Sequence, residues 1–79
     1  MDITSIIKLL TQRGAIYGKH YTIGGLGYNI FGIEKMGRFW YSYETKKNRK
    51  TNYSRFSSEK DAYKFIIEKA KSTAESYGL

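Results

Sequence analysis

The chain has 79 residues, a formal net charge of +7 and no cysteine, and 41% of its residues are hydrophobic and 16% aromatic. This length and apolar content predict one small globular domain, residues 1–79, and argue against disorder. Without cysteine there is no disulfide and no thiolate to bind zinc or act as a nucleophile, which fits a reducing compartment.

The start of the chain predicts neither a secretory leader nor a membrane anchor. Asp2 stands where a leader carries positive charge, and no apolar run approaches the roughly 20 residues that a membrane span requires. We therefore expect a soluble cytoplasmic protein without a membrane partner.

Apolar residues at helical spacing predict a first helix near residues 3–13. Asp2 or Thr4 is suited to cap its start, and Gly14 to end it. Four glycines follow around a short strand near residues 21–23 and are typical of turns: Gly18, Gly24, Gly25 and Gly27. They match no nucleotide-binding pattern and lead into a strand, so a phosphate-binding loop is not expected.

The stretches YNIFGIEK and RFWYSYE predict two strands joined by a tight turn at Met36-Gly37, with Lys35 opposite Arg38. One face of this hairpin then carries Phe31, Ile33, Trp40 and Ser42. The other carries Ile30, Gly32, Glu34, Phe39, Tyr41 and Tyr43. A helix covers only one face. The second is richer in aromatic side chains, so we expect it to form the core and the Trp40 face to be exposed.

A basic turn, KKNRK, leads to a further strand, TNYSRF, and the chain closes with a long helix near residues 58–77. Ser58 and Asp61 form a start similar to a capping box, and Gly78 is suited to cap the end. The apolar stripe of this helix is Ala62, Phe65, Ile66, Ala70, Thr73 and Tyr77. The order α-β-β-β-β-α predicts an α+β fold with a short N-terminal helix, a four-stranded antiparallel sheet and a long C-terminal helix.

No pattern of catalytic or metal-binding residues occurs. His20 is the only histidine, the carboxylates are scattered, and no serine or threonine stands in an activating motif. We therefore expect no metal, no cofactor and no catalytic residue, and a binding protein rather than an enzyme.

The positive charge is concentrated between residues 35 and 55, where seven basic residues oppose the single acid Glu44. A localised basic patch beside aromatic side chains fits two kinds of partner. Nucleic acid would place phosphates on the basic side chains and stack bases on the rings. An acidic protein surface would meet the aromatic and arginine residues that are typical of binding hot spots.

For each kind of partner, the sequence resembles a known family of binding proteins. The segment from Ile33 to Lys69 resembles the arm-binding domain of phage integrases, and the helix-sheet-helix order is similar to the double-stranded-RNA-binding domain. A broader likeness, over roughly residues 3–69, rests on the blocks IEKMGRFWYSYE and RFSSEKDAYKFI. These blocks resemble the small immunity proteins of bacterial polymorphic, contact-dependent toxin systems. The matching positions are Ile33, Glu34, Lys35, Gly37, Trp40, Tyr41, Tyr43, Glu44, Phe56, Ser58, Glu59 and Ala62.

This resemblance implies a protein that binds a cognate toxin domain and occludes its active site or substrate path. The chain departs from the family after Glu44, where Thr45-Lys46 replaces the expected Arg-Gly. Its basic charge predicts an acidic partner surface. The predicted partner-binding residues are Phe31, Ile33, Arg38, Trp40, Lys46, Lys47 and Arg49. The alternative is a small basic nucleic-acid-binding domain, for which we expect weak duplex binding without sequence preference.

Overall fold

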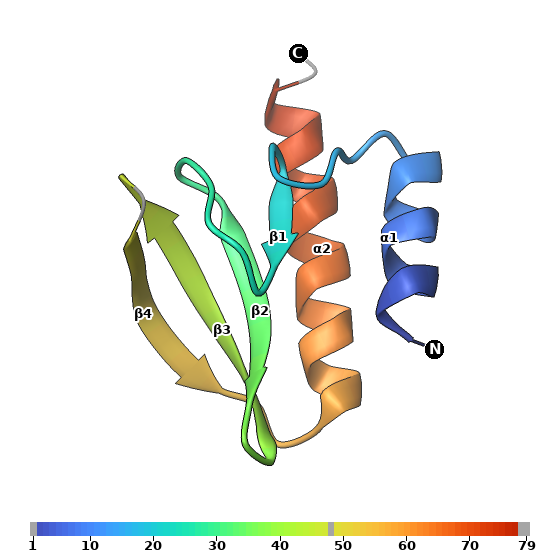
Figure 1. Ribbon diagram of the computed structural model, residues 1–79. Coiled ribbons are helices and arrows are strands. Elements are labelled where there is room, and N and C mark those ends of the chain that lie inside the picture. The colour runs from blue at the N-terminus through green and yellow to red at the C-terminus, as the bar shows by residue number, and fades with distance from the viewer. Residues whose placement is uncertain (1, 48, 78–79) are drawn as a thin grey trace.

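The computed structural model describes residues 2–47 and 49–77, with side chains described up to Glu75. The predicted α+β class and the predicted order of elements are confirmed (Figure 1). The elements are α1 (Ile3–Gln12), β1 (Tyr21–Ile23), β2 (Phe31–Met36), β3 (Phe39–Lys46), β4 (Arg49–Arg55) and α2 (Glu59–Tyr77). The expected cap at Gly78 and the side chain of Tyr77 lie outside the described part.

Local signals fix the helix ends. The Asp2 carboxylate accepts a hydrogen bond of 2.8 Å from the Ser5 N–H and caps α1. Gly14 follows the helix with a φ of +89°, a left-handed conformation that glycine adopts at little cost. At the start of α2 the Ser58 hydroxyl accepts from the Asp61 N–H at 3.2 Å. The predictions for both helix starts are therefore confirmed.

The sheet has the strand order β1-β2-β3-β4, and the three long strands are antiparallel as predicted. β1 instead runs parallel to β2, so the expectation of a fully antiparallel sheet is corrected in this detail. The reason lies in residues 24–30, which do not turn back beside β1 but cross one face of the sheet. Two bonds hold them there: the Tyr43 hydroxyl donates to the Gly25 carbonyl at 2.7 Å, and the Lys50 ammonium to the Gly24 carbonyl at 2.9 Å.

The β2–β3 hairpin turns at Gly37 and Arg38, and Met36 pairs with Phe39. The predicted turn at Met36-Gly37, with Lys35 opposite Arg38, is therefore wrong. Gly37 has a φ of +66°, which suits the first position of a two-residue hairpin turn. The register differs from the prediction by an even number of residues, so each face keeps its predicted members.

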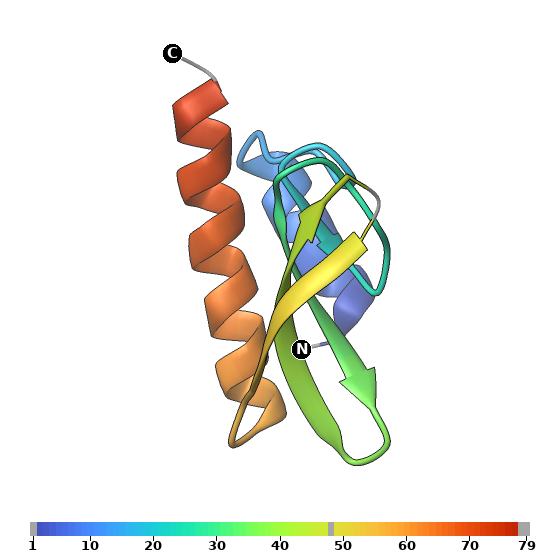
Figure 2. The same cartoon turned by 90° about the vertical axis from the view of Figure 1, so that its left-hand side faces the viewer.

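The helices and the sheet form two layers. α2 packs on β1, β2 and β3, and α1 packs on α2, whereas no helix of the described chain packs on β4 (Figures 1 and 2). The core between the layers contains Ile6, Leu10, Tyr21, Ile33, Trp40, Ala62, Ile66 and Ala70. Small alanines on the buried stripe of α2 allow this helix to lie close to the sheet.

Candidate functional site

The helix α2 covers the face of the β2–β3 hairpin that was predicted to be exposed, and no helix covers the face that was predicted to form the core. Ile33 is fully buried and Trp40 is only 7% exposed, because both lie under α2. The Trp40 ring meets Tyr63 of α2 edge-on, with 5.4 Å between ring centroids, and the half-buried Phe31 meets Phe65 in the same way at 6.0 Å. The expectation that Phe31, Ile33 and Trp40 form an exposed partner surface is therefore wrong.

Charge explains which face takes the helix. The uncovered face carries an ion pair between Glu34 and Lys50, and Arg55 lies on the same side. Covering these groups with an apolar helix would cost several kcal/mol for each charge removed from water. On the other face, the side chains at the contact with α2 include the uncharged Ile33 and Trp40, so this face packs under α2 at lower cost.

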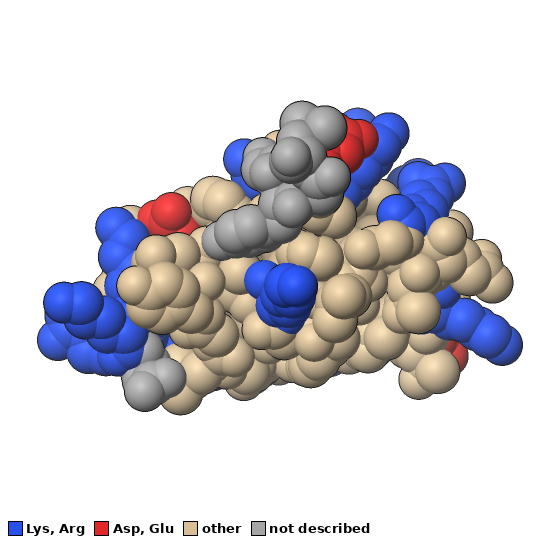
Figure 3. Space-filling view, turned by 90° about the horizontal axis from the view of Figure 1, so that it is seen from above, with Lys and Arg blue, Asp and Glu red and all other residues tan. Residues whose placement is uncertain are grey.

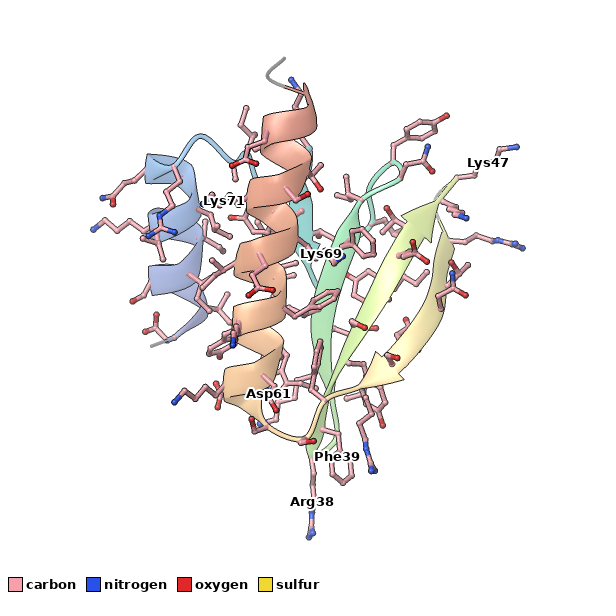
Figure 4. The ribbon with its side chains drawn as sticks, turned by 180° about the vertical axis from the view of Figure 1, so that it is seen from behind. Arg38, Phe39, Lys47, Asp61, Lys69 and Lys71 are labelled. Atoms are coloured by element: carbon pink, nitrogen blue, oxygen red, sulfur yellow. The ribbon has the colours of Figure 1, made fainter. Side chains whose placement is uncertain are left out.

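The basic residues of the predicted surface are exposed but do not come together. Lys46, Lys47 and Arg49 lie at the β3–β4 turn, where lysine and arginine side chains gather at one end of the molecule (Figure 3). Arg38 lies at the β2–β3 turn, at the opposite end of the sheet from Lys47 (Figure 4). The predicted basic residues thus lie at the two ends of the sheet, three at one turn and one at the other.

Residues 24–30, which we call the crossing segment, cover part of the sheet face that lies away from the helices. Tyr43, which was expected in the core, is buried beneath this segment rather than beneath a helix. Ile30, the last residue of the segment and also expected in the core, is itself buried. A Cβ at position 32 would lie 2.5 Å from Cζ of Tyr43 and 2.8 Å from Cγ2 of Thr22. Gly32 therefore leaves the space in which the Tyr43 ring crosses the sheet.

The remaining area, which we call the open face, consists of Glu34, Met36, Phe39, Tyr41, Lys50, Tyr53 and Arg55. Phe39 and Tyr41, also expected in the core, lie here, with Phe39 43% and Tyr53 44% exposed. Aromatic surface of this size on a small protein is typical of an interaction site.

A polar network fixes the centre of the open face. Glu34 accepts hydrogen bonds of 2.8 Å from the Lys50 ammonium and 2.8 Å from the Tyr53 hydroxyl. Burial opposes ionisation of Glu34, but these two bonds outweigh it and hold its pKa below the usual value. Burial, together with the Glu34 charge, raises the pKa of Tyr43 far above its ordinary value, so this hydroxyl stays protonated.

The cations of the open face lie against its rings. The Arg55 guanidinium lies 4.5 Å from the ring centroid of Phe39, and the Lys50 ammonium 5.0 Å from that of Tyr43. Tyr53 meets Tyr41 edge-on at 6.4 Å. These contacts hold the aromatic side chains in fixed positions before any partner arrives.

A β-bulge assembles this arrangement, and the sequence analysis missed it. Strict alternation along β4 places Lys50 on the face opposite Tyr53 and Arg55. The register shifts between Ser42 and Glu44, however, and Asn52 has a φ of +56°. The extra residue brings all three β4 side chains to the open face. An asparagine inside a strand was the available signal, since asparagine tolerates positive φ.

A hollow of about 650 Å³ also runs along α2, lined by Glu59, Lys60, Tyr63, Lys64, Ile67 and Glu68. Two acids and two lysines balance its charge. Burial, with a hydrogen bond to Glu59, raises the pKa of Tyr63 to about 12. The hollow is open to solvent and shows no polar groups converging on one point, unlike a ligand pocket.

Among the described residues, no three histidine or carboxylate side chains lie together where they could hold a metal ion. No helix in that part of the chain is long and apolar enough to cross a membrane. Comparisons with protein-family models, with curated proteins and with solved structures found no match. The open face is therefore interpreted from its own geometry.

Proposed function

We propose that this chain is a non-enzymatic cytoplasmic binding protein that neutralises a bacterial toxin domain by occluding it, as its likeness to small immunity proteins implies. The observation that carries the proposal is the open face, an exposed aromatic and basic surface that neither helix covers. Phe39, Tyr53 and Arg55 take the role that the sequence analysis gave to Phe31, Ile33 and Trp40. Arg38 and the basic β3–β4 turn flank this surface.

The composition of the open face supports a protein partner. Aromatic and arginine side chains carry most of the binding energy in protein interfaces. Phe39 and Tyr53 are already held by Arg55 and Glu34, so binding them costs little conformational entropy. Seven basic residues against one acid between residues 35 and 55 favour an acidic partner surface and fast association.

Nucleic-acid binding is the second candidate, favoured by the basic side chains at the two ends of the sheet. The rings argue against it. One side of the Phe39 ring is occupied by Arg55, and Tyr43 is buried beneath Lys50. Stacking of bases needs free ring faces.

The test is co-expression with the product of the reading frame adjacent to the gene of this chain, which the proposal expects to contain a toxin domain. We expect the cells to survive and the purified proteins to form an equimolar complex in calorimetry. A titration with single- and double-stranded oligonucleotides at about 0.15 M salt gives the other outcome. Absence of a complex with the toxin domain, together with a Kd near 10⁻⁸ M for one oligonucleotide sequence, would overturn the proposal in favour of nucleic acid.

A further inference from the structure

The two edges of the sheet differ in whether their backbone groups are paired. At the β1 edge, the Tyr17 hydroxyl donates to the Ile23 carbonyl at 2.9 Å and accepts from the Ile23 N–H at 3.3 Å. The Gly18 N–H donates to the Tyr21 carbonyl at 2.7 Å. Residues 17 and 18 thus occupy the positions of a neighbouring strand, and this edge is closed to another chain.

The β4 edge has no such cover. The Phe56 N–H, just after β4, donates to the Trp40 carbonyl at 2.8 Å, and alternation along an antiparallel strand turns the backbone groups of Arg55 away from β3. No hydrogen bond between described residues reaches this outer side of β4. Figure 2 looks onto this edge, where β4 lies in front of the sheet and apart from α2.

The charges of β4 indicate what this edge accepts. The strand carries Arg49, Lys50 and Arg55 and no acid, and Lys46 and Lys47 stand at the adjoining turn. A second copy pairing antiparallel through β4 would bring Arg49 and Lys50 toward Arg55 of that copy, and like charges on adjacent strands are destabilising. The bulge at Asn52 further bends the strand away from flat self-pairing. For an acidic strand the same charges are attractive.

We propose that β4 is the docking edge for an extended acidic segment of the partner protein, which adds to the sheet as a fifth strand. This inference rests on the proposed function and specifies its partner. Strand addition gives affinity through backbone hydrogen bonds, while side chains on the added strand give specificity. Alternate side chains of the added strand would lie on the open face beside Tyr53 and Arg55, so edge and face form one continuous surface.

The experiment uses peptide probes and the full chain. The first probe is a capped peptide of alternating glutamate and valine, about eight residues long to span β4. The second has the same sequence with its central backbone amides N-methylated, which removes strand pairing and keeps the charge. The third replaces glutamate by lysine. Binding is followed by NMR shifts and by hydrogen exchange of the backbone amides.

We expect the acidic peptide to slow exchange of the Arg55 amide about tenfold at saturation, and N-methylation to weaken binding at least tenfold. The lysine peptide should not bind. Arg55→Pro removes the outward N–H, so it should weaken the acidic peptide at least tenfold more than the matched control Arg55→Ala, which loses the charge but keeps the N–H. Thermal melting shows whether the proline variant is folded.

Equal affinity for the acidic peptide and its N-methylated form would overturn the inference, because charge alone would then explain binding. Failure of the acidic peptide to bind, or protection of helix amides instead of β4, would overturn it as well. Either result, together with a toxin complex that Arg55→Pro leaves intact, would leave the proposed function standing. If the wild-type chain does not neutralise the toxin, the proposed function itself is wrong.

Discussion

Trp40 and Phe39 are neighbours in the chain and lie on opposite faces of the sheet. Trp40 packs under α2 against Tyr63, whereas Phe39 is 43% exposed beneath Arg55. In the sequence these are two adjacent aromatic residues of similar character. Nothing local in it shows that one is buried and the other exposed. Glu34 was the residue that distinguished the faces, since an acid at the centre of one face argues against covering that face with an apolar helix.

This pair supplies a matched test of the face assignment. Trp40→Ala should destabilise the protein by about 3–5 kcal/mol, because it empties a buried aromatic site. The melting temperature should fall by about 15 °C or more. Phe39→Ala should cost less than about 1 kcal/mol, since Phe39 is 43% exposed and no helix packs on it. Equal losses in thermal melting of the two variants would show that the faces are not distinguished in this way.

Glu34 makes the free energy of unfolding depend on pH. Its pKa is lowered in the folded protein, so its contribution is present above the ordinary value of 4.5 and is lost as the pH falls through the lowered pKa. Glu34→Gln keeps the size of the side chain and removes the charge. We expect a loss of about 1 kcal/mol at neutral pH and a flatter decline in acid.

Denaturant unfolding between about pH 3 and pH 7 measures this effect. Glu68→Gln, which removes an exposed acid on α2, is the control and should leave the acid decline as in the wild type. If Glu34→Gln shows the wild-type slope below pH 4.5, the network of Glu34, Lys50 and Tyr53 does not contribute to stability as described.

Among the elements, the crossing segment of residues 24–30 has the largest effect on the site. Parallel strands usually need a connection of a dozen or more residues, and this one is shorter. It remains close to the sheet because Tyr43 and Lys50 bind its carbonyls, and Gly32 gives the Tyr43 ring room to lie beneath it. One glycine in β2 thereby determines how much of the face stays open.

Gly32→Ala should lower stability by about 1–3 kcal/mol, because the new methyl group meets the Tyr43 ring at 2.5 Å. In a Tyr43→Ala background the same change should cost at least about 1 kcal/mol less, since the contact is gone. A double-mutant cycle from denaturant unfolding gives this coupling. Additive losses would mean that the ring and the glycine are not in the contact described.

The helices were predictable because their signals are local. Asp2, Gly14 and Ser58 each act within four residues of their own position, and the apolar spacing fixes the buried stripes. The direction of β1 depends instead on Tyr43, far along the chain. The position of Lys50 on the open face depends on the bulge at Asn52, which breaks the alternation that sequence reasoning assumes.

For the whole molecule, the basic side chains of the central stretch do not form one patch. Lys46, Lys47 and Arg49 lie at the β3–β4 turn, whereas Lys50 and Arg55 lie on the open face. The basic side chains at the β3–β4 turn project into solvent, where they would steer the acidic partner that we propose. Lys46→Glu combined with Lys47→Glu should therefore slow association about tenfold at low salt and leave dissociation nearly unchanged. The difference should fade at about 1 M salt, where charges are screened within about 3 Å.

Stopped-flow binding to the toxin domain measures both rates. Lys60→Glu combined with Lys64→Glu changes the net charge equally on α2 and should affect association much less. A similar slowing by the two double variants would mean that net charge, rather than the location of the cluster, governs the encounter.

We propose that the open face, rather than the helix side, contacts the partner. The most direct measurement is the calorimetric affinity of Phe39→Ala combined with Tyr53→Ala for the toxin domain, beside Lys60→Ala combined with Lys64→Ala on α2. We expect a loss of about 2 kcal/mol or more, roughly thirtyfold in Kd, for the open-face variant and almost none for the α2 variant. Wild-type affinity in the open-face variant, with a large loss in the α2 variant, would contradict it.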